Sequence, residues 1–224
     1  MHLKSTATAK AAGVKTLVYG ESGSGKTSLI PTMPSPVIFS SERGLLSIAD
    51  SNLPFIDINS IKEFNEAYRW LISSKEAQQF QSVAIDSISD IAEVILKDEK
   101  EKSRDGRKAY GEMQDQVLEY LRLFRDLKGK HVLMIAKMEK GTDEMERTVY
   151  APSTPGTKLS QKLPYMFDEV FALRVERGQS GQAQRILLCN SDAIWTVKDR
   201  SRKLNQWESP HMGQIIQKIT GGRV

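Results

Sequence analysis

The chain of 224 residues has little of what secreted, membrane and zinc-binding proteins rely on. It contains a single cysteine, Cys189, so no disulfide can form within the chain, and this suits a reducing compartment. The histidines His2, His131 and His211 are scattered, and no Cys/His set has the spacing of a zinc site. No apolar run approaches the length of a membrane span, which argues against a transmembrane protein. We expect Cys189, in the apolar run RILLCN, to be a buried structural thiol.

The N-terminus, MHLKSTATAKAAGVK, lacks the continuous apolar core of a signal peptide and is basic and rich in Ala and Thr. We expect residues 1–13 to be a flexible lead-in and residues 14–224 to form a single domain. The composition, 39% hydrophobic and 27% charged, is that of a soluble globular protein. These features predict a cytoplasmic protein without membrane association.

The net charge of +4 permits binding to a polyanion without demonstrating it. Basic residues gather towards the C-terminal third, in RVERG and again in VKDRSRK. Two functional explanations stay open, a nucleic-acid face and groups aimed at a nucleotide phosphate. The alternative for each of these basic residues is that it is an ordinary, solvated surface residue without a binding role.

Short β-rich apolar runs alternate with amphipathic helical stretches, which indicates an α/β fold with a mostly parallel central sheet flanked by helices. Strands are expected at residues 14–19, 36–39, 82–86 and 131–137, and helices at 60–74, 88–96 and 114–128. Alternating residues around a glycine-rich turn at 168–190 predict a C-terminal antiparallel hairpin, with AIWTV (193–197) as a further strand. Two charged, aperiodic stretches, about 100–113 and 138–158, are expected to be mobile surface loops, the first alternatively a fraying helix end.

GESGSGKT, residues 20–27, matches the pattern G-x-x-x-x-G-K-[ST] between an expected strand and the start of a helix. Glycines let the backbone wrap a phosphate with successive N–H groups inward, and the new helix adds its positive end. Lys26 is placed to reach the β- and γ-phosphates, and Thr27 offers a hydroxyl to Mg²⁺. This phosphate loop predicts ATP binding by Gly20, Glu21, Ser22, Gly23, Ser24, Gly25, Lys26, Thr27 and Ser28.

Such a site also needs a carboxylate at the end of a buried strand to hold the water shell of the metal, and SVAIDS supplies Asp86. The alternative for Asp86 is an ordinary aspartate that caps the next helix. Ser87 could orient the metal waters or cap that helix, and both roles stay open. The residue after Asp86 is a serine, so the base that polarises the attacking water must lie elsewhere in the chain. Glu42 is the candidate, because it ends the second strand and the strand ends of a parallel sheet meet at one edge. A surface glutamate paired with Arg43 is the plain alternative for Glu42.

Three features together resemble the core of RecA-type recombinases: the glutamate that ends the second strand, SVAIDS, and the basic K-x-R of VKDRSRK. More narrowly, nearly the whole chain resembles the phage ATP-binding proteins of the Sak group, compact RecA-like single-strand annealing proteins. In that group a short, proline-terminated helix follows the phosphate loop and the next strand ends in Glu-x-Gly. Here Pro31, Pro34 and Pro36 follow the loop, and residues 42–44 read Glu-Arg-Gly. Further matches are PGTKL at 155–159, LPYMFDEV after it, and K-D-R-S-x-x-L at 198–204.

The resemblance implies a RecA-like P-loop NTPase core with Mg²⁺-dependent ATP hydrolysis. In it Glu42 is the catalytic base, acting with Lys26, and Asp86 holds the metal together with Thr27. Lys198 and Arg200 would reach the γ-phosphate of ATP in a neighbouring subunit, so a homo-oligomer with ATP at its subunit interfaces is implied. A solvated or DNA-facing basic turn is the alternative for these two residues.

Single-stranded DNA is the partner that the resemblance implies, with recombination or annealing in the cytoplasm of a bacterial host as the role. A single-stranded DNA-binding protein is a further implied partner. The DNA-contacting loops would fall on residues 100–113 and 138–158, where Tyr110 and Tyr150 could stack on bases. Both loops also carry acidic runs, DEKEK and TDEMER, which weaken the electrostatic attraction to DNA.

The chain departs from the recombinase pattern at two points. Lys137 stands where such cores carry a glutamine that senses the γ-phosphate, and no separate N- and C-terminal domains are recognisable. We therefore expect annealing or accessory work rather than autonomous strand exchange. A nucleotide-gated assembly factor, such as a helicase loader or phage regulator, is the second hypothesis, and a small-molecule kinase is a weaker third. FNEA, 64–67, resembles a recombinase interaction motif, but its position on an apolar helix face predicts a core segment.

Overall fold

The computed structural model describes residues 3, 13–42, 44–177, 181–190 and 192–222. Among these residues, ten strands are joined in one sheet. The strands are β1 (Lys15–Tyr19), β2 (Pro36–Ser40), β3 (Phe55–Asp57), β4 (Ser82–Asp86), β5 (His131–Thr142), β6 (Thr148–Ser153), β7 (Glu169–Arg177), β8 (Ala183–Leu188), β9 (Lys198–Asp199) and β10 (Trp207–Glu208). The helices are α1 (Ile61–Ser73), α2 (Ile88–Lys102), α3 (Gly106–Arg125), α4 (Thr157–Met166), α5 (Met212–Thr220) and the short 3-10 helices η2 (Thr27–Thr32), η3 (Leu45–Ser51) and η4 (Glu76–Gln79).

The strand order is β10-β8-β7-β1-β5-β4-β2-β3, with β6 paired to β5 and β9 to β7. The run from β7 to β3 is parallel throughout, whereas β8, β10, β6 and β9 pair antiparallel. The predicted fold class is therefore confirmed, including the C-terminal hairpin, which is β7–β8. Because β1, β4 and β2 are parallel, the segments that follow them lie at one edge of the sheet.

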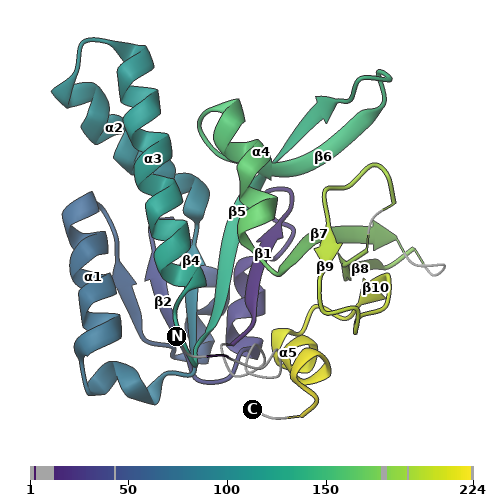
Figure 1. The fold of residues 1–224 in the computed structure, drawn as a ribbon. Helices are drawn as coiled ribbons and strands as arrows, with labels where there is room; N and C mark the ends of the chain where they lie inside the picture. Colours follow the sequence, from purple (N-terminus) through teal and green to yellow (C-terminus); the bar gives the residue numbers. More distant parts are fainter. Residues whose placement is uncertain (1–2, 4–12, 43, 178–180, 191, 223–224) are drawn as a thin grey trace.

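The central strands are buried over their whole length because helices cover both faces of the sheet. One core contains Leu17, Tyr19 and Phe39 with the apolar faces of α1 to α4, and Figure 1 shows α1, α2 and α3 together on one side. The other core contains Val18 and Ile38 with η2, η3 and α5. Alternate residues of each strand thus serve opposite cores. Phe64 and Ala67 of the FNEA segment are buried in the first core, as predicted.

The helix after the phosphate loop is as short as its prolines predict. It is the six-residue 3-10 helix η2, and Pro31 lies inside it. Proline has no N–H to donate and crowds the preceding turn, so a longer α-helix cannot form there. Thr32 ends η2, and its Oγ1 accepts a hydrogen bond from the N–H of Met212 at the start of α5.

The two segments expected to be loops contain regular structure. Residues 100–102 are the end of α2, which agrees with the helix end kept as the alternative for the first segment, whereas a loop is wrong for most of the second, where β5 and β6 pair. The Asp105 carboxylate accepts hydrogen bonds from the N–H groups of Arg107 and Lys108, and this cap starts α3 within a charged stretch. Further on, β5 continues to Thr142 and pairs with β6 as an antiparallel hairpin, which Figure 1 shows projecting from the sheet. The mobility of both segments stays a prediction.

The expected strand at residues 193–197 is also wrong. Only one bridge forms there, between Trp195 and Tyr150, because Trp195 is held by its ring. Its indole stacks on Tyr150 at 4.3 Å between centroids and lies 6.3 Å from Tyr19. Of the expected lead-in, only Leu3 and Gly13 fall within the described residues. No helix in the described ranges is long and apolar enough to cross a membrane.

Candidate active site

The phosphate loop turns from the end of β1 into η2 with the backbone that its glycines allow. Gly23 and Gly25 have φ values of +76° and +94°, a region that side chains other than glycine rarely occupy. The loop lines a cavity of about 490 Å³ together with Glu42, Ser87, Lys137 and Arg185. The predicted phosphate-binding residues, except the buried Ser24, therefore open onto one cavity at the edge of the sheet.

Lys26 folds over the loop that precedes it. Its Nζ donates to the main-chain oxygens of Gly20 and Glu21, both at 2.8 Å. Burial lowers the pKa of Lys26, and the nearby carboxylates of Glu42 and Asp86 oppose that shift. A phosphate in the cavity would offer this ammonium group stronger acceptors than the two carbonyls do.

The phosphate loop is joined directly to the end of β4. Thr27 Oγ1 donates a 2.8 Å hydrogen bond to Asp86 Oδ2, although β5 separates β1 from β4 in the sheet. Burial raises the pKa of Asp86 to about 6; the hydrogen bond from Thr27 opposes this, and the negative charge of Glu42 adds to it. The structure thus brings together the hydroxyl and the carboxylate that were predicted to hold a metal.

A magnesium ion fits the oxygen groups at this point. Within the described residues, the buried Asp86 Oδ1 has no hydrogen-bond partner, so this carboxylate keeps acceptor capacity beside Thr27. No cluster of three or more His, Cys, Asp or Glu side chains suited to a metal occurs in the ranges described. Mg²⁺ does not need such a cluster, because it takes one or two protein oxygens and completes its shell with phosphate and water.

Glu42 follows β2, the neighbour of β4, and lies at the same edge. Ser40 is paired with Asp86 in the sheet, and the N–H groups of Ser41 and Glu42 donate to Asp86 O at 2.8 and 3.2 Å. The exposed side chain of Glu42 lines the cavity, so a carboxylate faces the space beyond the phosphate loop. This is the position that a base acting on water would need.

Ser87 caps α2, which is one of the two roles that the sequence leaves open; the orientation of metal waters stays a prediction. Its Oγ accepts a hydrogen bond from Asp90 N at 3.2 Å and donates to the Asp90 carboxylate at the start of α2. The peptide between Asp86 and Ser87 is cis. With its hydroxyl engaged in this way, Ser87 fixes the beginning of α2 beneath the cavity.

Lys137 connects the cavity to α2. It lies on β5, between the phosphate-loop strand and the strand of Asp86. Its Nζ donates to Asp90 Oδ1 at 2.7 Å and to Glu93 Oε1 at 3.0 Å. These ion pairs are partly exposed, so they contribute little to stability, but they fix where the ammonium group rests.

Lys198 and Arg200 lie away from the phosphate loop of their own chain. Lys198 on β9 pairs with Val170 of β7, and Arg200 N donates to Asp168 O next to the amino end of β1. The loop follows the opposite end of that five-residue strand, roughly 16 Å away at the usual rise. Lys198 Nζ donates to Pro164 O and Phe167 O, both at 2.6 Å, whereas the Arg200 guanidinium pairs with Asp168 and stays 60% exposed.

Arg185 belongs to the site and escapes sequence reasoning. It stands on β8, and its Nε donates to Ser24 O at 2.9 Å, across 161 positions of the chain. The only signal in the sequence is the general gathering of basic residues towards the C-terminal third, which does not single out one arginine.

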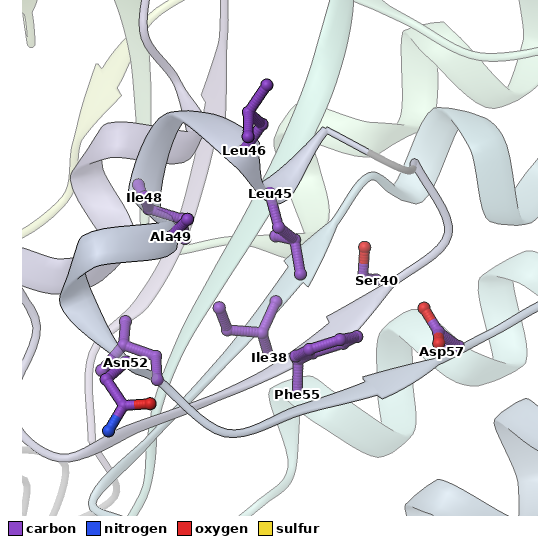
Figure 2. A pocket seen from close by; sticks show the side chains of 10 residues that line it. Ile38, Ser40, Leu45, Leu46, Ile48, Ala49, Asn52, Phe55 and Asp57 are labelled. Carbon is purple, nitrogen blue, oxygen red and sulfur yellow. The ribbon is translucent and has the colours of Figure 1, made fainter.

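A second cavity of about 500 Å³ lies between η3 and the edge strand β3, next to the end of β2 that precedes Glu42. Figure 2 shows Leu45, Ile38 and Phe55 facing one another there. Helix η3 borders both cavities, since Ser47 lines the phosphate cavity. The second cavity is mainly apolar, so the chemistry belongs at the phosphate loop.

Comparison with known proteins identifies a family and finds similar solved structures. A family model described as AAA domain, AAA_24, matches residues 12–201, a range that contains every site residue named above. No curated protein matches the chain. Among solved structures, the chain is similar to a KaiC-like protein, PH0186, from the hyperthermophilic archaeon Pyrococcus horikoshii OT3. The two are 17% identical with a TM-score of 0.46, over 79% of this chain and 78% of that one.

Proposed function

The chain belongs to the AAA_24 family of AAA domains, and on that premise we propose that it binds and hydrolyses ATP with Mg²⁺. We extend the proposal to a RecA-like phage protein of the Sak group, which works on single-stranded DNA in the cytoplasm of a bacterial host. It would promote annealing or recombination as an oligomer with ATP at the subunit boundaries.

The observation that carries the proposal is the 2.8 Å bond from Thr27 Oγ1 to Asp86 Oδ2, with Glu42 just after the neighbouring strand β2. Loop amides and Lys26 would bind the triphosphate, and Thr27 and Asp86 would hold the metal. Mg²⁺, when bound, neutralises charge on the phosphates. Glu42 would accept a proton from the attacking water, because its carboxylate faces the cavity that the loop lines.

Support for single-stranded DNA comes from the exposed end of the α2–α3 pair. Tyr110 is 38% exposed, and Lys100 Nζ lies 5.3 Å from the centre of its ring, a basic and aromatic pair of the kind that binds single strands. Tyr150 supports the proposal less, because its ring is already stacked on Trp195. We therefore propose that Tyr110, rather than Tyr150, stacks on a base. A single-stranded DNA-binding protein remains a further proposed partner.

A nucleotide-gated assembly factor with little turnover is the second candidate. The observation that favours it is Lys137, which is held by Asp90 and Glu93 where a RecA-type core carries a sensing glutamine. In such a protein ATP would order the segments around the cavity, and fast hydrolysis would be unnecessary.

The substitution Glu42→Gln separates the two functions. For the ATPase we expect turnover to fall by about 100-fold or more, since general bases contribute 10²- to 10⁴-fold, while ATP affinity is retained. The measurements are ATP binding and phosphate release, with and without single-stranded DNA. Glu119→Gln, at an exposed glutamate of α3 outside residues 100–113, is the matched control and should behave as wild type.

Each result has a distinct meaning. A wild-type protein that binds no ATP contradicts nucleotide use altogether. Slow turnover that Glu42→Gln leaves unchanged favours the assembly factor. Hydrolysis without stimulation by DNA, together with no DNA binding at low salt, rejects the role on single strands while leaving the ATPase intact.

A further inference from the structure

Arg185 reaches the phosphate loop from the middle of β8. Across the hairpin it pairs with Val175 of β7, and its Nε donates to Ser24 O at 2.9 Å. The side chain also lies against Gly25: a Cβ added there would be 2.6 Å from Arg185 Nε and 3.0 Å from its Cδ. Gly25 therefore provides the space for this arginine, in addition to its positive φ.

Arg185 lies at the cavity that the phosphate loop lines, where the cations of Lys26 and Lys137 face the carboxylates of Glu21 and Glu42. Within the described residues, the bond to Ser24 O is the one hydrogen bond of Arg185, and it uses only one of five N–H donors. A guanidinium keeps its charge at any working pH, and its planar fork matches two phosphate oxygens at once.

We propose that Arg185 binds the phosphates of the nucleotide held by the loop of its own chain, an inference that rests on the proposed ATP binding. Lys198 and Arg200 do not supply this charge within the chain, because the Lys198 ammonium group donates to Pro164 O and Phe167 O and the Arg200 guanidinium pairs with Asp168. The β7–β8 hairpin thereby becomes part of the nucleotide site. Nucleotide binding ties this hairpin to the phosphate loop through one side chain.

The test compares Arg185→Ala and Arg185→Gln with wild type, with Arg177→Ala as the control. Arg177 is an exposed arginine at the end of β7, on the same hairpin. We measure the dissociation constant for Mg-ATP and the melting temperature with and without Mg-ATP. Both Arg185 variants should lose about 10-fold or more in ATP affinity and most of the ATP-induced rise in melting temperature. Without nucleotide their melting temperatures should match that of Arg177→Ala, because Arg185 is exposed.

Arg185→Gln distinguishes phosphate binding from support of the loop. A glutamine amide can still donate to Ser24 O but carries no charge. If Arg185→Gln binds Mg-ATP as tightly as wild type, Arg185 only supports the loop through Ser24, and the proposal is overturned. Wild-type affinity in Arg185→Ala would overturn it as well. Lys26→Ala keeps the two proposals separate: if it abolishes ATP binding while the Arg185 variants bind normally, the proposed function stands and the role of Arg185 is wrong. If wild type binds no ATP, both fail.

Discussion

Glu169 is a buried carboxylic acid at the amino end of β7. It lies towards the edge of the sheet opposite to the one where the phosphate loop begins. Burial is the largest cause that raises its pKa from 4.5 to about 8, and repulsion from Asp199, its partner on β9, adds to the shift. Its Oε1 accepts a hydrogen bond from Ser201 N. The folded protein therefore holds a proton on Glu169 at neutral pH, whereas the unfolded chain releases it.

This proton predicts a pH dependence of stability. Between about pH 5 and 8 the folded state binds more protons at Glu169 than the unfolded state, so the free energy of unfolding falls as pH rises, by at most about 1.4 kcal/mol per pH unit. Below the unfolded pKa both states are protonated and the effect is fully favourable. Glu169→Gln should remove this slope. Urea titrations of both proteins at several pH values measure it, and parallel profiles across the window would contradict the prediction.

Among the elements, α3 depends on its first turn. The helix begins at Gly106 and carries a second glycine, Gly111, so its N-terminal part has low intrinsic helix propensity. Asp105 compensates by accepting two of the N–H groups that a helix start leaves unsatisfied. Asp105→Ala should therefore lower the free energy of unfolding by about 1 kcal/mol and increase amide exchange at residues 107–110. Asp115→Ala, at an exposed position inside the same helix, is the control; an equal loss there would argue against capping.

An element could be predicted from the sequence when the residues that determine it are close together in the chain. The strands around the site and the short η2 depend on neighbouring residues, and the sequence predicts them. The hairpin strand β6 depends on its register with β5, and residues 193–197 depend on ring packing of Trp195, so neither outcome is visible locally.

The residues of the candidate site also fall into two groups: those that the sequence predicts and those that only the tertiary structure reveals. A contiguous pattern identifies the phosphate loop, and the parallel sheet explains why Glu42 and Asp86 meet. Arg185 meets Ser24 only because β8 folds beside the loop, and Lys137, in the middle of β5, meets Asp90 only because α2 packs against that strand. Contacts of this kind come from the tertiary structure, so a single sequence does not show them.

At the scale of the whole molecule, the positions of Lys198 and Arg200 bear on whether an oligomer could bring a cation to the nucleotide of a neighbouring subunit. Arg200 lies level with the amino end of β1 and Lys198 level with its middle, and neither side chain contacts the phosphate loop of its own chain, so their action on a loop in another subunit stays a proposal. Lys198 is committed to two carbonyl groups at 2.6 Å, and burial lowers its pKa. The Arg200 side chain is 60% exposed and, within the part of the chain that the structure describes, pairs with the surface carboxylate of Asp168 alone, so it can change partners at low cost. Of the two, Arg200 is the residue suited to act across an interface.

Mixing two inactive variants tests this role. Lys26→Ala lacks the loop lysine but keeps Arg200, and Arg200→Ala keeps its loop but lacks the arginine; each alone should hydrolyse ATP at least 100-fold more slowly than wild type. If Arg200 acts across the interface, mixed oligomers contain some boundaries with an intact loop on one side and an intact arginine on the other. Phosphate release should then reappear on mixing and rise with total protein concentration. Lys26→Ala mixed with the Lys26→Ala/Arg200→Ala double variant should stay inactive. Full activity of Arg200→Ala alone, or a mixture no more active than its parts, would show that the arginine serves only its pair with Asp168.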